Sequence, residues 1–339
     1  MGPPRRDRVQ PQPRSRLPQT PDRQEEGIAA VEGTRAQRLM NEIRELKAKR
    51  NAVLLAHNYQ PAPIQDLADF CGDSLGLSIE AAKTEAEVIV FCGVRFMAET
   101  AKILSPDKTV LLPDRWAGCP MADMITAEQL RDLKQKHPEA LVVCYVNSTA
   151  DVKAESDYCC TSANAVDVVR SLPMDRPILF VPDQHLGRFV AQQTGRDLIL
   201  WPGYCPTHVL IGEDDIRRAK EQYPEAVVIA HPECSEPVKD LADALLSTGQ
   251  MLGFVRKSPA RRFIVATEVG MLHPLQKVRP DAEFLPAGSR GICPNMKKIT
   301  LEKVLASLTD LQFPIEVPED IRRQAERSLQ RMVEILPEK

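Results

Sequence analysis

The stretch "AGCPMADMITAEQLRDLKQKHPEALVVCYV", residues 117–146, aligns without gaps with "GYCPTHVLIGEDDIRRAKEQYPEAVVIAHP", residues 203–232. In both, a Cys-Pro pair precedes a helix-like segment, a Pro-Glu-Ala sequence and an apolar run. A third Cys-Pro pair stands in "RGICPNMKKITLEKVLASL", residues 290–308, and the three cysteines are 86 and 88 residues apart. Fewer than one such pair is expected by chance from nine cysteines and 28 prolines. The three pairs therefore indicate an internal repeat.

Three sets of polar residues repeat with nearly the same period. Each set has one member per repeat, spaced by 85 to 88 residues. The sets are Tyr59, Asn147 and Glu233; His57, Tyr145 and His231; and Ser74, Ser162 and Ser247. The first two sets stand where apolar runs end, and parallel α/β sheets bind ligands beyond the carboxyl ends of their strands. We therefore expect these side chains and the three cysteines to converge on one site. Three separate pockets are the alternative.

The rest of the pattern predicts the fold class. From residue 52 onward, short apolar runs such as "VIVFCG", "PILFVP" and "RFIVAT" alternate with amphipathic segments of helix length. Apolar strands separated by helices are typical of parallel sheets covered on both faces. We expect an α/β protein of three homologous α/β/α sandwich domains around a pseudo-threefold axis, with the active site at the central junction. The expected domains are 37–140 with an N-terminal helix, 141–226 and 227–315, followed by a C-terminal helix in 316–339.

Composition restricts the class of partner. The chain has 339 residues, 43% hydrophobic and 27% charged, with a net charge of −3. These values predict no general affinity for nucleic acid or membrane. An odd number of cysteines without an export signal predicts reduced thiols and a cytoplasmic location. Residues 1–36 are rich in Pro, Arg and Gln and poor in large apolar residues, which predicts a disordered tail.

Three converging cysteines are compatible with two kinds of metal site. With His208 they would form a tetrahedral Cys₃His zinc site. Alternatively, they would hold an iron–sulfur cubane with one iron open to substrate as a Lewis acid. Single ligands about one domain apart favour the cluster, since zinc ligands usually come in close pairs. An enzyme, a non-enzymatic iron–sulfur carrier or sensor and a zinc-stabilised binding protein stay open on the residues alone. The other cysteines are expected in the core: Cys71, Cys92, Cys144, Cys159, Cys160 and Cys234.

The chain also resembles a known family. "AHNYQ", "GDSLGLS", "GCPMADM", "CYVNS", "TSANA", "PDQHLG", "HPEC", "ATEVGMLH" and "CPNMKKITL" are similar to motifs of the quinolinate synthase family, from about residue 37 to the last turns of the chain. The resemblance implies three α/β/α domains and a 4Fe–4S cluster held by one cysteine per domain. It also implies condensation of iminoaspartate with dihydroxyacetone phosphate to quinolinate, the pyridine precursor of NAD.

The resemblance assigns roles to particular residues. Cys119, Cys205 and Cys293 would hold the cluster, and "CPNMKKI" lacks the further cysteines that some relatives carry there. Tyr59 and Glu233 would be acid/base groups. The implied substrate-binding residues, of which His57 and His231 would also shuttle protons, are His57, Ser74, Tyr145, Asn147, Ser162, His208, His231, Glu233, Ser247 and Thr248. An L-aspartate oxidase or dehydrogenase is the implied source of iminoaspartate.

Overall fold

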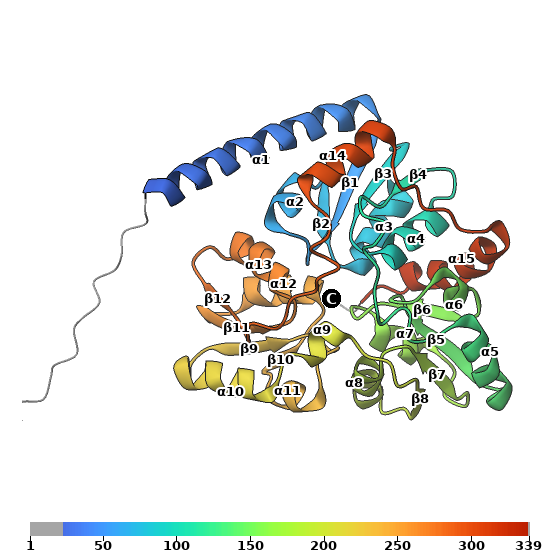
Figure 1. Cartoon of the computed structure of the whole chain (residues 1–339). Coiled ribbons are helices and arrows are strands. Elements are labelled where there is room, and N and C mark those ends of the chain that lie inside the picture. Colours follow the sequence, from blue (N-terminus) through green and yellow to red (C-terminus); the bar gives the residue numbers. More distant parts are fainter. Residues whose placement is uncertain (1–22, 338–339) are drawn as a thin grey trace, which may run out of the picture. The chain divides into compact units, whose positions relative to one another are not determined.

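Three parallel β-sheets form the core of the protein. The computed structural model describes residues 23–337, with side chains from residue 34 onward, and each sheet has four strands (Figure 1). The strands are β1 (Ala52–His57), β2 (Phe70–Gly72), β3 (Val88–Cys92) and β4 (Thr109–Leu111); β5 (Leu141–Tyr145), β6 (Tyr158–Cys160), β7 (Ile178–Val181) and β8 (Leu198–Leu200); and β9 (Val227–Ala230), β10 (Ala244–Leu245), β11 (Arg262–Ala266) and β12 (Glu283–Pro286). The order in space is the same in all three sheets, namely β2-β1-β3-β4, β6-β5-β7-β8 and β10-β9-β11-β12. The predicted α/β class with parallel sheets is confirmed.

Helices connect the strands in the same places in each unit. The short helices after the first strands are α2 (Ala62–Leu67), α6 (Ala150–Ala154) and α11 (Glu236–Asp240). Those after the second strands are α3 (Ser74–Lys83), α7 (Ala165–Ser171) and α12 (Thr248–Lys257). Those after the third strands are α4 (Arg95–Leu104), α8 (Gln184–Thr194) and, behind the 3₁₀ helix η1 (Val269–Met271), α13 (Leu272–Val278). After the fourth strands come α5 (Ala127–Lys136), α9 (Pro206–Val209) with α10 (Glu213–Gln222), and α14 (Leu301–Asp310), before the final helix α15 (Glu319–Glu334).

An aspartate just before each second strand holds the first strand in place. Asp69, Asp157 and Asp243 each accept a hydrogen bond from a backbone N–H of the first strand, at 2.7, 2.8 and 2.7 Å. The three residues are 88 and 86 residues apart, the period of the polar strand ends. The repeat read from the sequence therefore extends to individual hydrogen bonds.

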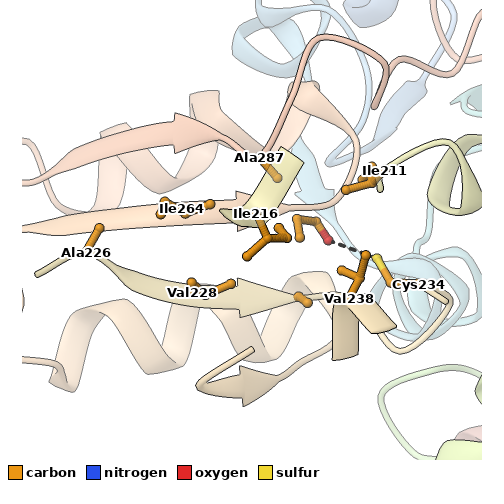
Figure 2. Close-up of a cluster of buried hydrophobic side chains, with 10 residues drawn as sticks. Ile211, Ile216, Ala226, Val228, Cys234, Val238, Ile264 and Ala287 are labelled. Carbon is orange, nitrogen blue, oxygen red and sulfur yellow. Dashed lines mark hydrogen bonds between the residues drawn. The ribbon is translucent and has the colours of Figure 1, made fainter. Parts of the chain in front are cut away.

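The helix after each fourth strand packs on the following unit. Figure 2 shows Ile216 of α10 among apolar side chains of the third sheet and its flanking segments. This buried cluster consists of Ile211, Ile216, Ala226, Val228, Ala230, Cys234, Val238, Ile264, Ala266 and Ala287. In the same way α5 contacts α6 of the second unit, and α14 contacts β3 of the first unit. The three units are thus interlocked in a cycle.

The domain boundaries expected at residues 140 and 226 stay a prediction. Those boundaries assigned α5 and α10 to the units that precede them, whereas their packing partners lie in the units that follow. The physical reason is that an amphipathic helix buries its apolar face against the sheet to which the preceding turn delivers it. Helix α14 completes the cycle by packing on the first unit. The segment after α14 bonds to β4, since the backbone N–H of Ile315 donates to the carbonyl oxygen of Val110 at 2.8 Å.

Three buried side chains connect neighbouring units at equivalent positions. Gln65, Lys153 and Lys239 follow the first strand of their unit and are 88 and 86 residues apart. Each donates a hydrogen bond to a backbone carbonyl of the helix after the third strand in the preceding unit, counted cyclically, at 3.0, 3.1 and 2.9 Å. Buried amides and ammonium groups need such acceptors, so these bonds join the three units in the same way.

The first helix begins earlier than the sequence predicts. Helix α1 spans Arg23–Lys49, although residues 23–36 were expected in the disordered tail. Residues 23–36 contain three Glu, three Ala and two Arg, which are strong helix formers. Residues 1–22 of the expected tail lie outside the described residues. Contacts divide the chain into an N-terminal unit ending at Arg38 and a main unit from Leu39 onward. Within residues 23–337, no helix is long and apolar enough to cross a bilayer.

Candidate active site

A cavity of about 140 Å³ is lined by residues of all three units. All but one of the site residues expected from the sequence are among those that line it: His57, Tyr59, Ser74, Cys119, Tyr145, Asn147, Ser162, Cys205, His208, His231, Glu233, Thr248 and Cys293. The exception is Ser247. Its hydroxyl accepts the N–H of Gln250 at 3.3 Å and caps helix α12, and it does not line the cavity.

The Cys-Pro pairs place each thiol at the start of a turn. Cys205 is the N-cap residue of α9 and Pro206 takes the first helical position, where a missing N–H costs nothing. The carbonyl oxygen of Cys205 accepts the backbone N–H of Val209 at 3.1 Å, and that of Cys119 accepts the N–H of Ala122 at 3.0 Å. This geometry explains why the two residue types recur together.

One thiol from each unit lines the cavity. Burial raises the pKa of Cys119 to about 12 and that of Cys205 well above its ordinary value, so without a metal these thiols keep their protons. All nine cysteines lie in the described part of the chain, and Cys119, Cys205 and Cys293 are the ones that line the cavity. Thiolates are soft ligands of the kind that zinc and iron–sulfur clusters take.

The other cysteines lie away from the cavity. Those with buried side chains are Cys92, Cys144, Cys159, Cys160 and Cys234. Cys71 is partly buried, and its sulfur lies 3.5 Å from the amide oxygen of Gln65. These placements agree with the expected core positions.

Two histidines have the same tautomer in equivalent positions. The backbone N–H of Tyr59 donates to His57 Nδ1 at 3.2 Å, and that of Glu233 donates to His231 Nδ1 at 3.3 Å. Because a backbone N–H only donates, each Nδ1 is an acceptor and each ring proton lies on Nε2. Burial lowers the pKa of both imidazoles to about 3. His57 and His231 are therefore neutral Nε2–H donors.

A buried carboxylate lies at the centre of the polar network. Glu233 Oε1 accepts the hydroxyl of Tyr145, and Glu233 Oε2 lies 2.8 Å from His208 Nδ1. Burial raises the pKa of Glu233, but the electrostatic interaction with the imidazoles of His208 and His231 and the hydrogen bonds from His208 and Tyr145 outweigh burial and hold the pKa well below its usual range. An ionised carboxylate accepts only, so His208 Nδ1 carries a proton. The same Nδ1 lies 3.1 Å from Cys205 Sγ.

The other ring nitrogen of His208, Nε2, lies next to a threonine hydroxyl. Thr267 Oγ1 lies 2.9 Å from His208 Nε2 and 2.6 Å from the hydroxyl of Tyr59. Burial and the nearby Glu233 carboxylate raise the pKa of Tyr59 well above its ordinary value. Tyr59 is therefore a neutral phenol that can donate a proton but not remove one near neutral pH.

Thr267 and Glu268 are site residues that the repeat did not single out. They follow the apolar strand β11, and Glu268 lines the cavity with a buried carboxylate. Its oxygens accept the N–H of Cys293 at 3.1 Å and of Gly270 at 2.7 Å, and pair with Lys297 at 2.9 Å. Polar residues directly after a third strand are the signal that would have identified them. Glu268 thus holds the turn that carries the third thiol.

The chain is similar to proteins of known activity. A family model described as Quinolinate synthetase A protein matches residues 41–334. Quinolinate synthase of Geobacter metallireducens (strain ATCC 53774 / DSM 7210 / GS-15) is 57% identical over 300 residues, covering 88% of this chain and 98% of the relative. The protein of the same name from Dehalococcoides mccartyi (strain CBDB1) is 55% identical over 298 residues, with the same coverage. That of Methanosarcina barkeri (strain Fusaro / DSM 804) is 52% identical over 297 residues, covering 88% and 97%.

The match covers every strand of the three sheets and all three Cys-Pro turns that bring thiols to the cavity. The site geometry and the sequence similarity therefore agree, and the chain belongs to the quinolinate synthetase A family of enzymes.

Proposed function

We propose that this chain condenses iminoaspartate with dihydroxyacetone phosphate to form quinolinate for NAD biosynthesis. The atoms balance when one phosphate and two water molecules leave. The observation that carries the proposal is the convergence of three thiols, two neutral histidines and an ionised glutamate on one buried cavity. Repeated dehydration and imine chemistry need a Lewis acid together with positioned proton donors and acceptors. An iron–sulfur carrier or sensor would have no use for such acid/base groups.

We place the cavity at the junction of three domains related by a pseudo-threefold axis. The identical strand order of the three sheets supports this arrangement. The equivalent bonds of Gln65, Lys153 and Lys239 to the preceding unit support it further. Each unit contributes one Cys-Pro thiol and one polar strand end to the cavity.

The proposed cofactor is a 4Fe–4S cluster with Cys119, Cys205 and Cys293 as its ligands. When bound, such a cluster supplies one iron without a protein ligand, which acts as a Lewis acid on substrate oxygen and nitrogen. The donor set supports it, since three cysteines and no fourth line the cavity.

The remaining side chains would bind substrate and move protons. The Nε2–H groups of His57 and His231 would donate to substrate carboxylate or carbonyl oxygens. Glu233 is the base of the set because its carboxylate is ionised, and Tyr59 is the acid because its phenol is neutral. The amide oxygen of Asn147 is buried without a hydrogen-bond partner in the described structure, so it would accept a hydroxyl or imine N–H of the substrate.

Hydroxyl groups at helix starts would bind the anionic ends of the substrates. Ser74 opens α3, Thr248 opens α12, and both line the cavity with Ser162. Backbone N–H groups at such positions and hydroxyls together suit carboxylate or phosphate. Ser247 would act on the substrate only through the start of α12, which it caps. Supply of iminoaspartate by an L-aspartate oxidase or dehydrogenase, and the cytoplasmic location, stay predictions.

The test is anaerobic purification followed by an activity assay. A brown protein with about four irons per chain that forms quinolinate from dihydroxyacetone phosphate and iminoaspartate, the latter generated from oxaloacetate and ammonia, is the expected result. Iron chelation should abolish product formation. The ligand atoms of Cys205, His208 and Glu233 also lie within 4.8 Å of one another. A colourless protein that holds zinc there and makes no quinolinate would contradict the proposal.

Replacing Gly270 with alanine should displace the catalytic tyrosine. A Cβ at residue 270 would lie 2.7 Å from the backbone oxygen of Tyr59 and 2.8 Å from Glu268 Oε2, so one of these groups must move. We expect a loss of about 1–3 kcal/mol in the free energy of unfolding and a lower kcat with the iron content unchanged. Chemical denaturation and steady-state kinetics measure both effects.

Gly253→Ala is the matched control for this variant. Gly253 lies inside α12, and a Cβ there meets no atom within 4 Å. The alanine should stabilise the protein by about 0.5–1 kcal/mol, because a helix interior favours Ala over Gly, and activity should not change. Equal effects of the two substitutions would contradict the proposed contact at Tyr59.

A further inference from the structure

Asn164 makes four hydrogen bonds that join the final helix to the cavity. Its side chain is fully buried. The amide oxygen accepts the N–H of Thr161 at 2.8 Å and the Thr161 hydroxyl at 3.1 Å. The amide nitrogen donates to the carbonyl oxygens of Met332 and Ile335 at 2.9 and 2.8 Å. These four bonds use all of the hydrogen-bonding capacity of the asparagine side chain.

The position of Asn164 makes this arrangement unusual. It is the N-cap residue of α7, where an asparagine side chain normally accepts an N–H of its own helix, but it makes no such bond. The equivalent residues of the other two repeats are Gly76 and Gly249, which have no side chain to place there. Helix α15 packs on the second unit, where it contacts strand β6. The asparagine therefore serves the contact with α15 rather than the start of α7.

Helix α15 packs against β6 and α6 of the second unit. Before the strand, Arg331 Nη1 donates to the carbonyl oxygen of Asp157 at 2.7 Å, and its guanidinium lies 4.7 Å from the ring centre of Tyr158. In the strand, Cys159 Sγ lies 3.3 Å from Ser328 Oγ. After the strand, the side-chain amide of Asn164 donates hydrogen bonds to the last carbonyls of α15. Those carbonyls lack partners within the helix, so Asn164 supplies donors that the helix end needs.

The residues that Asn164 holds belong to the substrate cavity. Thr161 and Ser162 both line it, and the Ser162 hydroxyl lies 3.1 Å from Nε2 of His231. The contacts therefore run from the end of α15 through Asn164 and Thr161 to Ser162 and His231. A shift of this loop by a fraction of an ångström would change the donor geometry that a bound substrate meets.

We propose that Asn164 is a positioning residue that lets helix α15 set the place of Ser162 in the substrate cavity. This inference rests on the proposed function, because Ser162 is assigned there to substrate binding. Helix α15 is then part of the substrate site even though no residue of α15 lines the cavity.

The test is Asn164→Asp. The new side chain keeps the acceptor for Thr161 but has no N–H for Met332 and Ile335, whose carbonyls it repels. For the anaerobically purified holoenzyme we expect the KM for at least one substrate to rise about tenfold. The kcat should change less than about threefold, and the visible spectrum and iron content of the cluster should be unchanged. Hydrogen exchange of the amides in residues 158–165 should become faster.

Two further variants define the origin of the effect. Arg331→Ala removes the bond to Asp157 from the exposed side of α15 and should cause a smaller change of the same kind. Gln330→Ala is the control, because Gln330 bonds to Glu326 within its own helix, and it should match the unsubstituted protein. For Asn164→Asp, a fall in the amount of folded or cluster-loaded protein at unchanged KM would show a merely structural role and overturn the inference. Unchanged KM together with unchanged amide exchange would also overturn it. If the unsubstituted protein forms no quinolinate, the proposed function fails, and the exchange rates still decide whether Asn164 couples α15 to the loop.

Discussion

Replacing Cys205 with alanine should remove both the cluster and the activity. Cys205 is, in sequence order, the middle one of three thiols that line the cavity. Its loss would leave two of the three proposed cluster ligands, too few to hold a cubane that normally needs at least three. We expect the iron content to fall from about four per chain to background after anaerobic reconstitution, with quinolinate formation undetectable. Iron analysis, the visible spectrum and product quantification measure these outcomes.

Cys234→Ala is the matched control for the cysteine substitution. Cys234 is fully buried in the apolar cluster of the third sheet and lies outside the cavity (Figure 2). Its loss should lower stability by about 1–2 kcal/mol, as expected when a small buried group is truncated, while the cluster and turnover are retained. If Cys205→Ala kept a full complement of iron, the assignment of the three ligands would be wrong.

Replacing Glu233 with glutamine should stop turnover without removing the cluster. The carboxylate is the proposed base and receives hydrogen bonds from Tyr145 and His208. Glutamine has nearly the same shape but cannot take up a proton at neutral pH. We expect kcat to fall by roughly 10²–10⁴-fold, the usual contribution of a positioned acid/base group, with unchanged iron content.

Glu225→Gln is the control that shows whether the loss of turnover is specific to Glu233. Glu225 is exposed and pairs with Arg262 at the surface, where removal of an ion pair costs less than about 1 kcal/mol. It should leave kcat and KM unchanged. Turnover by Glu233→Gln at the rate of the unsubstituted enzyme would assign the base to another residue.

The convergence of the site could be predicted from the sequence because it is written as a period along the chain. Cys119, Cys205 and Cys293 recur in Cys-Pro pairs, and the polar strand ends recur with them, so one cavity shared by equivalent units follows from the spacing. Some residues outside the period were missed. Glu268 is an example, since its partners Cys293 and Lys297 lie 25 and 29 residues further along the chain.

The sequence by itself determined the α/β class, the three units and the three thiols, because each depends on local pattern and its repetition. Tertiary structure alone decided which sheet each helix covers, as α10 shows by packing on the third sheet. It also decided which nitrogen of His57 carries the proton, since a backbone N–H occupies the other one. The bonds of Asn164 to the end of α15 join residues 168 and 171 positions apart. Such contacts arise when separate segments are brought together by burial of their apolar faces, and no local spacing records them.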